Sequence, residues 1–211
     1  MYFCTKSKVS AACLALALSG ALTTGVQAED WSGVYGGITL GAGPVDFTSA
    51  LGSDGDMYKS TGKSIGGLLG YNAQEGKLIF GVEAEYGSVS GADYNLEGSD
   101  GFNSNLHQNE LTAAGFLRAR IGFEVTETTM VYSSVGMAFL QGTITSSDSD
   151  YYGTYNANAF ELGMGIEKMV MENLSVRGSA YLLTNAVTDA PVSEQDFMSM
   201  NRISLAVSYH F

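Results

Sequence analysis

The stretch from Asn201 to Phe211 constrains the fold more than any other part of the chain. A period of two with one apolar and one polar or small face predicts a β-strand. A long strand whose apolar face ends on an aromatic residue is typical of transmembrane β-barrels, in which each strand faces lipid on one side and the lumen on the other. Ile203, Leu205, Val207, Tyr209 and Phe211 alternate with Arg202, Ser204, Ala206, Ser208 and His210.

The beginning of the chain has the pattern of a secretory signal peptide. Lys6 and Lys8 precede an almost wholly apolar or small run from Val9 to Leu22, and Val26-Gln27-Ala28 has the small residues of a cleavage site. The apolar run is too short for a spanning helix. We therefore expect residues 1–28 to be removed and residues 29–211 to form one domain.

The composition of residues 29–211 argues against several classes of function. Cys4 and Cys13 both lie in the predicted signal peptide, so the mature domain has no disulfide and no thiol chemistry. Removing Lys6 and Lys8 leaves eight Lys and Arg against 22 Asp and Glu, a net charge of −14. This acidity argues against nucleic acid as a partner, because nucleic-acid binding needs a basic surface.

Eight alternating segments can be read along the mature domain, and the lengths of their connections predict the topology. Short connections at 74–77, 126–128 and 168–173 alternate with long ones at 44–63, 90–110, 142–157 and 183–200. Outer-membrane barrels have long external loops and tight periplasmic turns. The chain is therefore predicted to be an all-β protein, an eight-stranded antiparallel up-and-down transmembrane β-barrel in the outer membrane, with both termini in the periplasm. The expected strands are 33–43, 64–73, 78–89, 111–125, 129–141, 158–167, 174–182 and 201–211.

Parity assigns a face to each side chain of these strands. In the fourth segment Leu111 falls with Leu117 on the apolar, lipid-facing side, opposite Arg118 and Arg120. The fifth segment is ambiguous, and we favour an outward Val131, Val135, Met137 and Phe139 with Gly136 and Ala138 inward. Aromatic girdles at the membrane interfaces are a further expectation. The candidates are Trp31, Tyr35, Phe123, Tyr132, Tyr209 and Phe211.

The polar faces carry charges of both signs, and these predict a salt-bridge network in the lumen. An eight-stranded barrel is just wide enough for side chains to fill it, so buried charges of opposite sign must pair. The expected network is Glu83, Glu85, Arg118, Arg120, Glu161, Arg177 and Arg202. Two alternatives remain: a charged constriction that selects ions, and a soluble barrel with its apolar face turned inward around a ligand.

Several short blocks together resemble a known family. Trp31-Ser32-Gly33-Val34-Tyr35-Gly36-Gly37, Gly81-Val82-Glu83-Ala84-Glu85 and Leu117-Arg118-Ala119-Arg120-Ile121-Gly122 are similar to the small porin-like outer-membrane proteins of Brucella, Bartonella and rhizobia, within the OmpA-like β-barrel superfamily. The resemblance implies insertion by the β-barrel assembly machinery, which reads the closing strand, with Tyr209 and Phe211 as the assembly signal. The seventh strand departs from the family at Gly178-Ser179-Ala180. The loops carry whatever is specific to each member, so the resemblance implies no particular ligand.

Other candidate sites have simpler interpretations. His107 beside Asp93 or Glu110 suits an acid–base pair, but a solvated loop histidine explains it as well. Two acidic pairs, Asp54 with Asp56 and Asp148 with Asp150, lack the spacing of a full calcium loop. We expect no enzymatic activity, no cofactor and no resident metal.

The sequence therefore predicts a structural and surface-display protein of the outer membrane, in contact with its lipid and lipopolysaccharide. One alternative is a narrow porin passing small polar solutes. The other is an adhesin or ligand-binding surface protein that binds a host or surface ligand through its loops, carried by Tyr151, Tyr152 and Tyr155 in the third long connection.

Overall fold

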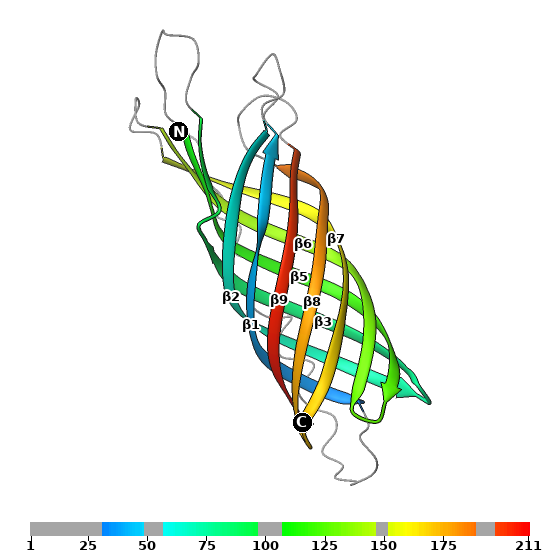
Figure 1. Ribbon diagram of the computed structural model, residues 1–211. Helices are drawn as coiled ribbons and strands as arrows, with labels where there is room; N and C mark the ends of the chain where they lie inside the picture. The colour runs from blue at the N-terminus through cyan, green and yellow to red at the C-terminus, as the bar shows by residue number, and fades with distance from the viewer. Residues whose placement is uncertain (1–30, 49–56, 97–106, 147–151, 189–196) are drawn as a thin grey trace, which may run out of the picture.

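The computed structural model describes residues 31–48, 57–96, 107–146, 152–188 and 197–211, and every regular element in these ranges is a β-strand. None of the described residues forms a helix that is long and apolar enough to cross a membrane. Figure 1 shows the strands wrapped around one elongated barrel. The strands are β1 (Gly33–Thr48), β2 (Met57–Glu75), β3 (Leu78–Ser90), β4 (Asp93–Leu96), β5 (His107–Thr126), β6 (Thr129–Ser146), β7 (Tyr152–Met171), β8 (Leu174–Thr188) and β9 (Phe197–His210).

The sheet closes on itself. Sequence neighbours pair antiparallel, β1 also pairs with β9, and β3 pairs with β5 across the remaining gap. The short β4 continues β3 after Gly91, whose φ of 74° lies in the left-handed region that favours glycine, and it pairs with β5. β3 and β4 thus occupy one place in the wall. The barrel has eight positions, which confirms the predicted fold class.

Three tight turns join strands at one end of the barrel, here called the turn end. They connect β2 to β3 at Gly76–Lys77, β5 to β6 at Glu127–Thr128 and β7 to β8 at Glu172–Asn173. Trp31 and Phe211 lie at this end too, and the amide of Phe211 donates to the carbonyl of Val34 at 2.9 Å. The three short connections fall within the predicted ranges 74–77, 126–128 and 168–173, and they are shorter than predicted because β2 runs on to Glu75 and β7 to Met171. The opposite end is called the loop end.

Most strands run farther toward the loop end than predicted. β1 and β2 stay paired from Gly33↔Asn72 as far as Thr48↔Met57, and β6 and β7 as far as Thr145↔Tyr152. Much of each predicted long connection is therefore strand. His107 is the first residue of β5 and not part of a loop.

The two faces of the wall have opposite chemistry over most of the barrel. Ile38, Leu205 and Val135 are outward and exposed, whereas the inward neighbours on the same strands are polar or small. The favoured parity of 129–141 is confirmed, because Met137 and Phe139 are exposed and Ala138 is buried. The outward face forms an apolar belt around the barrel.

The predicted outward position of Leu111 is wrong. Pairing between β5 and β6 shifts register between Leu111 and Ala113, so Thr112 is an extra residue in β5. Residues on the two sides of a bulge exchange faces. Leu111 is consequently fully buried in the barrel interior, together with Ala114 and Phe116.

Half of the predicted aromatic girdle also lies inside. Trp31, Tyr35 and Tyr132 are buried, while Phe123, Tyr209 and Phe211 are exposed on the outer face at the turn end. Tyr71 and Phe80 join these outward rings at the turn end. Tyr86, Phe139 and Phe160 are outward farther along the same wall.

Inward tyrosines lie against glycines on neighbouring strands. Tyr35 is the register partner of Gly70, Tyr132 of Gly165, and Tyr181 of Gly163. A Cβ on any of these glycines would overlap the tyrosine ring. Because these glycines have no side chain, the large tyrosine rings can pack against the backbone of the neighbouring strand and fill the lumen.

Candidate functional site

The candidate site is the barrel interior, where four glutamates and four arginines are buried. β3 supplies Glu83 and Glu85, β5 supplies Arg118 and Arg120, and β7 supplies Glu161 and Glu167; Arg177 comes from β8 and Arg202 from β9. Acidic and basic strands stand side by side: Glu83 is the register partner of Arg118, and Glu167 of Arg177. The buried charges balance, as a low-dielectric interior requires.

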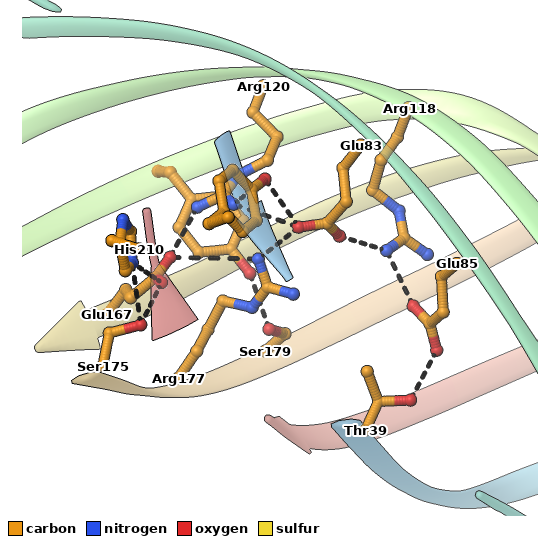
Figure 2. Close-up of polar contacts among 12 residues, drawn as sticks. Thr39, Glu83, Glu85, Arg118, Arg120, Glu167, Ser175, Arg177, Ser179 and His210 are labelled. Carbon is orange, nitrogen blue, oxygen red and sulfur yellow. Dashed lines mark hydrogen bonds and ion pairs between the residues drawn. The ribbon is translucent and has the colours of Figure 1, made fainter. Parts of the chain in front are cut away.

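Arg118 is the hub of the half of the network nearer the loop end. Its Nη1 donates to Glu83 at 2.7 Å and to Glu85 at 2.8 Å, and its Nε donates to Glu161 at 2.8 Å. Arg202 completes this half by donating to Glu85 Oε1 at 2.6 Å. Thr39 on β1 donates its hydroxyl to the same carboxylate at 3.0 Å (Figure 2).

Glu83 links this half to the half nearer the turn end. Arg120 Nη1 lies 3.1 Å and Arg177 Nη1 2.5 Å from Glu83 Oε2. Tyr35 donates its hydroxyl to the same oxygen at 2.8 Å and accepts from Arg120 at 2.7 Å. Arg120 Nη2 also reaches Glu167 at 2.8 Å. One carboxylate thus joins three arginines.

A serine and a histidine end the network at the turn end. Ser175 donates to Glu167 Oε1 at 2.7 Å, and His210 Nε2 lies 3.1 Å from the Ser175 hydroxyl (Figure 2). The His210 ring stacks on Tyr35 at 5.4 Å and meets Trp31 edge-on at 5.8 Å. Ser175 has no exposed surface, and its hydroxyl donates to the Glu167 carboxylate. The Ser175 hydroxyl thus links the His210 ring to the charged network.

Aromatic rings cover the faces of the guanidinium groups. Arg202 lies 4.2 Å from the centroid of Phe116, Arg118 lies 4.6 Å from that of Tyr181, and Arg120 lies 4.1 Å from that of Tyr132. Such contacts stabilise a desolvated cation. The edges of the guanidiniums pair with carboxylates while their faces pack on rings, so little cross-section is left around them.

Apolar clusters lie on both sides of the charges. At the turn end Trp31, Ile79, Met130 and Met169 pack together. Toward the loop end a larger cluster includes Val89, Leu111, Leu140, Leu183 and Met200. A cavity of about 20 Å³ beside Thr39, Glu85 and Arg202 has room for about one water molecule. Over the described residues the lumen is therefore layered as apolar, charged and apolar.

The structure brings all seven residues of the predicted network together in one connected cluster. The predicted network left out Glu167, Tyr35, Thr39, Ser175 and His210. Each shares the inward parity of its strand, so parity alone offered a signal for all five. Glu167 and Ser175 meet because β7 and β8 are neighbours, whereas Tyr35, Thr39 and His210 join the network because barrel closure places β1 against β9.

The other candidate residues are placed only in part by the described ranges of the chain. Asp93 and Glu110 are register partners in β4 and β5, and His107 lies opposite Leu96 in the same ladder. Tyr155 is buried against Gly142 inside the barrel and is not displayed outward. Asp54, Asp56, Asp148, Asp150 and Tyr151 lie outside the described residues. Over the described ranges no group of three or more His, Cys, Asp or Glu side chains is placed to hold a metal.

A closed eight-stranded wall, with an apolar outer belt and buried paired charges within, defines the class of small outer-membrane β-barrels. The chain belongs to the outer membrane protein beta-barrel domain family, whose model matches residues 11–211. It is a protein of the outer membrane.

Similar proteins agree with this assignment. A 22 kDa outer membrane protein of Rhizobium leguminosarum bv. viciae is 29% identical, covering 71% of this chain and 62% of the relative. A 31 kDa outer-membrane immunogenic protein of Brucella melitensis is 27% identical over 76% of this chain and 73% of that protein. The chain thus spans less than two thirds of the rhizobial relative's length.

Two solved barrels show the same fold. Neisserial surface protein A has a TM-score of 0.50 at 15% identity, with 85% of this chain and 98% of that chain covered. The outer membrane protein OprG from Pseudomonas aeruginosa has a TM-score of 0.50 at 11% identity, with 88% and 99% covered.

Proposed function

We propose that this protein is a structural and surface-display component of the outer membrane, without transport or enzymatic activity. The observation that carries the proposal is the layered lumen, in which paired charges lie between two apolar clusters. A wall protein that offers no aqueous path acts through its outer surface and its loop end. The relative from Brucella is named for immunogenicity, which supports display at the cell surface.

The proposal includes an orientation. Short turns and both ends of the barrel domain lie at the turn end, the arrangement that outer-membrane barrels have on the periplasmic side. Residues 1–28 act as a cleaved signal peptide, and the strand ending at Phe211 is read by the β-barrel assembly machinery. The loop end then carries the surfaces available to a host or surface ligand.

A tag experiment tests display and orientation together. A short epitope inserted between residues 148 and 149 is predicted to bind antibody on intact cells. The same epitope inserted in the Glu172–Asn173 turn should bind only after the outer membrane is permeabilised, and total insertion should be checked by the gel shift between boiled and unboiled samples. Antibody binding to the Glu172–Asn173 epitope on intact cells would show that the turn end faces outward, and it would contradict the proposal.

A further inference from the structure

Toward the loop end the outer face of the barrel wall becomes polar and the inner face becomes apolar. On β3 the outward residues Val82, Ala84 and Tyr86 are followed by the exposed Ser88 and Ser90. The inward glutamates of the same strand give way to Val89, which belongs to the apolar cluster of the loop end. An apolar interior with a polar exterior is the pattern of a barrel surrounded by water and not by hydrocarbon.

The exchange recurs on β6, β7 and β9. Going toward the loop end on β6, the exposed Gln141 comes after Phe139. In the same direction on β7, Asn158 and Asn156 come after Phe160. On β9, Asn201 comes after Ile203. The apolar stretches 131–139 and 203–211 have the length of roughly 9–11 residues that a tilted transmembrane strand needs. The hydrocarbon boundary therefore lies where outward Tyr86, Phe139 and Phe160 end the belt.

A surface of amide and hydroxyl side chains begins directly beyond that boundary. We call it the amide–hydroxyl band. It consists of Ser88, Ser90, Gln141, Asn156, Asn158 and Asn201, all exposed. Gln141 and Asn156 are register partners on β6 and β7, so the band runs across strands.

We propose that the amide–hydroxyl band binds the core sugars of the outer-leaflet glycolipid. The proposal rests on the orientation given above, with the loop end outside. The band continues the lipid-facing belt on the same strands, so the part of the lipid just above the acyl chains is its neighbour. Amides and hydroxyls both donate and accept hydrogen bonds and so match sugar hydroxyls.

Charge distinguishes sugars from phosphates as the bound groups. Phosphate recognition relies on Arg and Lys. Among the described side chains at this level Lys63 and Glu110 are charged, one of each sign, so the surface is close to neutral. An acidic chain with such a surface suits uncharged sugar hydroxyls and not the phosphates of the lipid anchor.

Single-cysteine reporters test the proposal, because residues 29–211 contain no cysteine. Asn158→Cys is the reporter in the band, Met164→Cys is the control in the belt, and Glu172→Cys is the control at the turn end. Each variant is refolded in bicelles of phosphatidylcholine alone, with lipid A, or with rough lipopolysaccharide that carries core sugars. The rate of reaction with a charged maleimide is measured, since bicelles leave both ends of the barrel accessible.

We expect Asn158→Cys to react severalfold more slowly with rough lipopolysaccharide than with lipid A or phosphatidylcholine. Glu172→Cys should keep its rate in all three, and Met164→Cys should be unreactive throughout. Replacing Gln141 and Asn156 by Ala in the reporter chain should restore the fast rate. Equal slowing by lipid A, equal slowing at Glu172→Cys, or persistent protection after the alanine changes would each overturn sugar binding. Because bicelles carry the glycolipid on both faces, a reversed orientation in cells would not alter these rates.

Discussion

At the scale of single residues, the interior depends on complementary partners that no residue can supply alone. Arg120 shows this most clearly, since it bonds to Glu83, Glu167 and Tyr35 from three different strands. Removing one member of a buried ion-pair cluster leaves carboxylates without compensation. Each interior charge in this barrel therefore stabilises the positions of its partners.

Arg120→Ala is predicted to lower the free energy of unfolding by about 3–5 kcal/mol, the cost of leaving a buried charge unpaired. Guanidinium titration of the refolded protein in detergent micelles measures it. Lys168→Ala, at an exposed outward position of β7, is the matched control and should change little. Adding Glu167→Gln to Arg120→Ala should recover part of the loss. A stability equal to that of the unmutated protein would mean that water, and not the network, solvates these groups.

Gly163 gives a second test at this scale. A Cβ at Gly163 would overlap the Tyr181 ring and the Ser134 hydroxyl, so Gly163→Ala should destabilise the barrel by about 1–3 kcal/mol through overpacking. Gly67→Ala is the control, because Gly67 is exposed on the outer face and its nearest neighbour to a new Cβ is 3.8 Å away. The denaturant midpoints of unfolding of the two variants are compared with that of the unmutated protein. Equal stability of the two would show that the tyrosine can move aside.

At the scale of elements, the strands have a membrane section and a section beyond it. The boundaries expected from sequence, such as 141 in β6 and 158 in β7, fall where the outward side chains turn polar. Alternation with apolar residues outward therefore detects the membrane section of a strand. It misses the continuation, where backbone pairing runs on as far as Thr145↔Tyr152 between β6 and β7.

The closing strand β9 has a side chain whose role is separable from packing. The Phe211 side chain is 78% exposed and meets Tyr209 edge-on at 5.2 Å. Deleting Phe211 or changing it to Ser should reduce insertion in cells, while Phe211→Tyr should be tolerated better because an aromatic end is kept. Insertion is measured from the fraction of heat-shifted protein in isolated outer membranes.

Phe123→Ser is the matched control for Phe211→Ser, since Phe123 is an exposed ring at the same end of the barrel. The unfolding free energies of the two variants in micelles should be similar, and only Phe211→Ser should fail in cells. An equal loss of insertion for both would show that Phe211 serves as one more lipid-facing aromatic and not as an assembly signal.

At the scale of the whole molecule, the alternating segments and the lengths of their connections predict the eight-stranded wall, and parity identifies the charged residues that face the interior. What parity missed arises from contacts between distant segments. Leu111 is inward because of a bulge against β6, and Trp31 is inward because it packs on Ile79, Met130 and Met169. His210 reaches Ser175 and Tyr35 because β9 lies between β8 and β1. Such placements follow from closure and not from local pattern.

The central claim is that the lumen is closed by paired charges held between two apolar clusters. Single-channel recording on refolded residues 29–211 in a planar bilayer tests it most directly, with a general porin in the same bilayer as the control for sensitivity. We predict negligible steady conductance for the unmutated protein, because the buried ion pairs of Arg118 and Arg120 lie across the lumen between the two apolar clusters. A reproducible open channel in the unmutated protein, with ion selectivity altered by Arg120→Ala and stability unchanged, would contradict the account and favour a narrow porin.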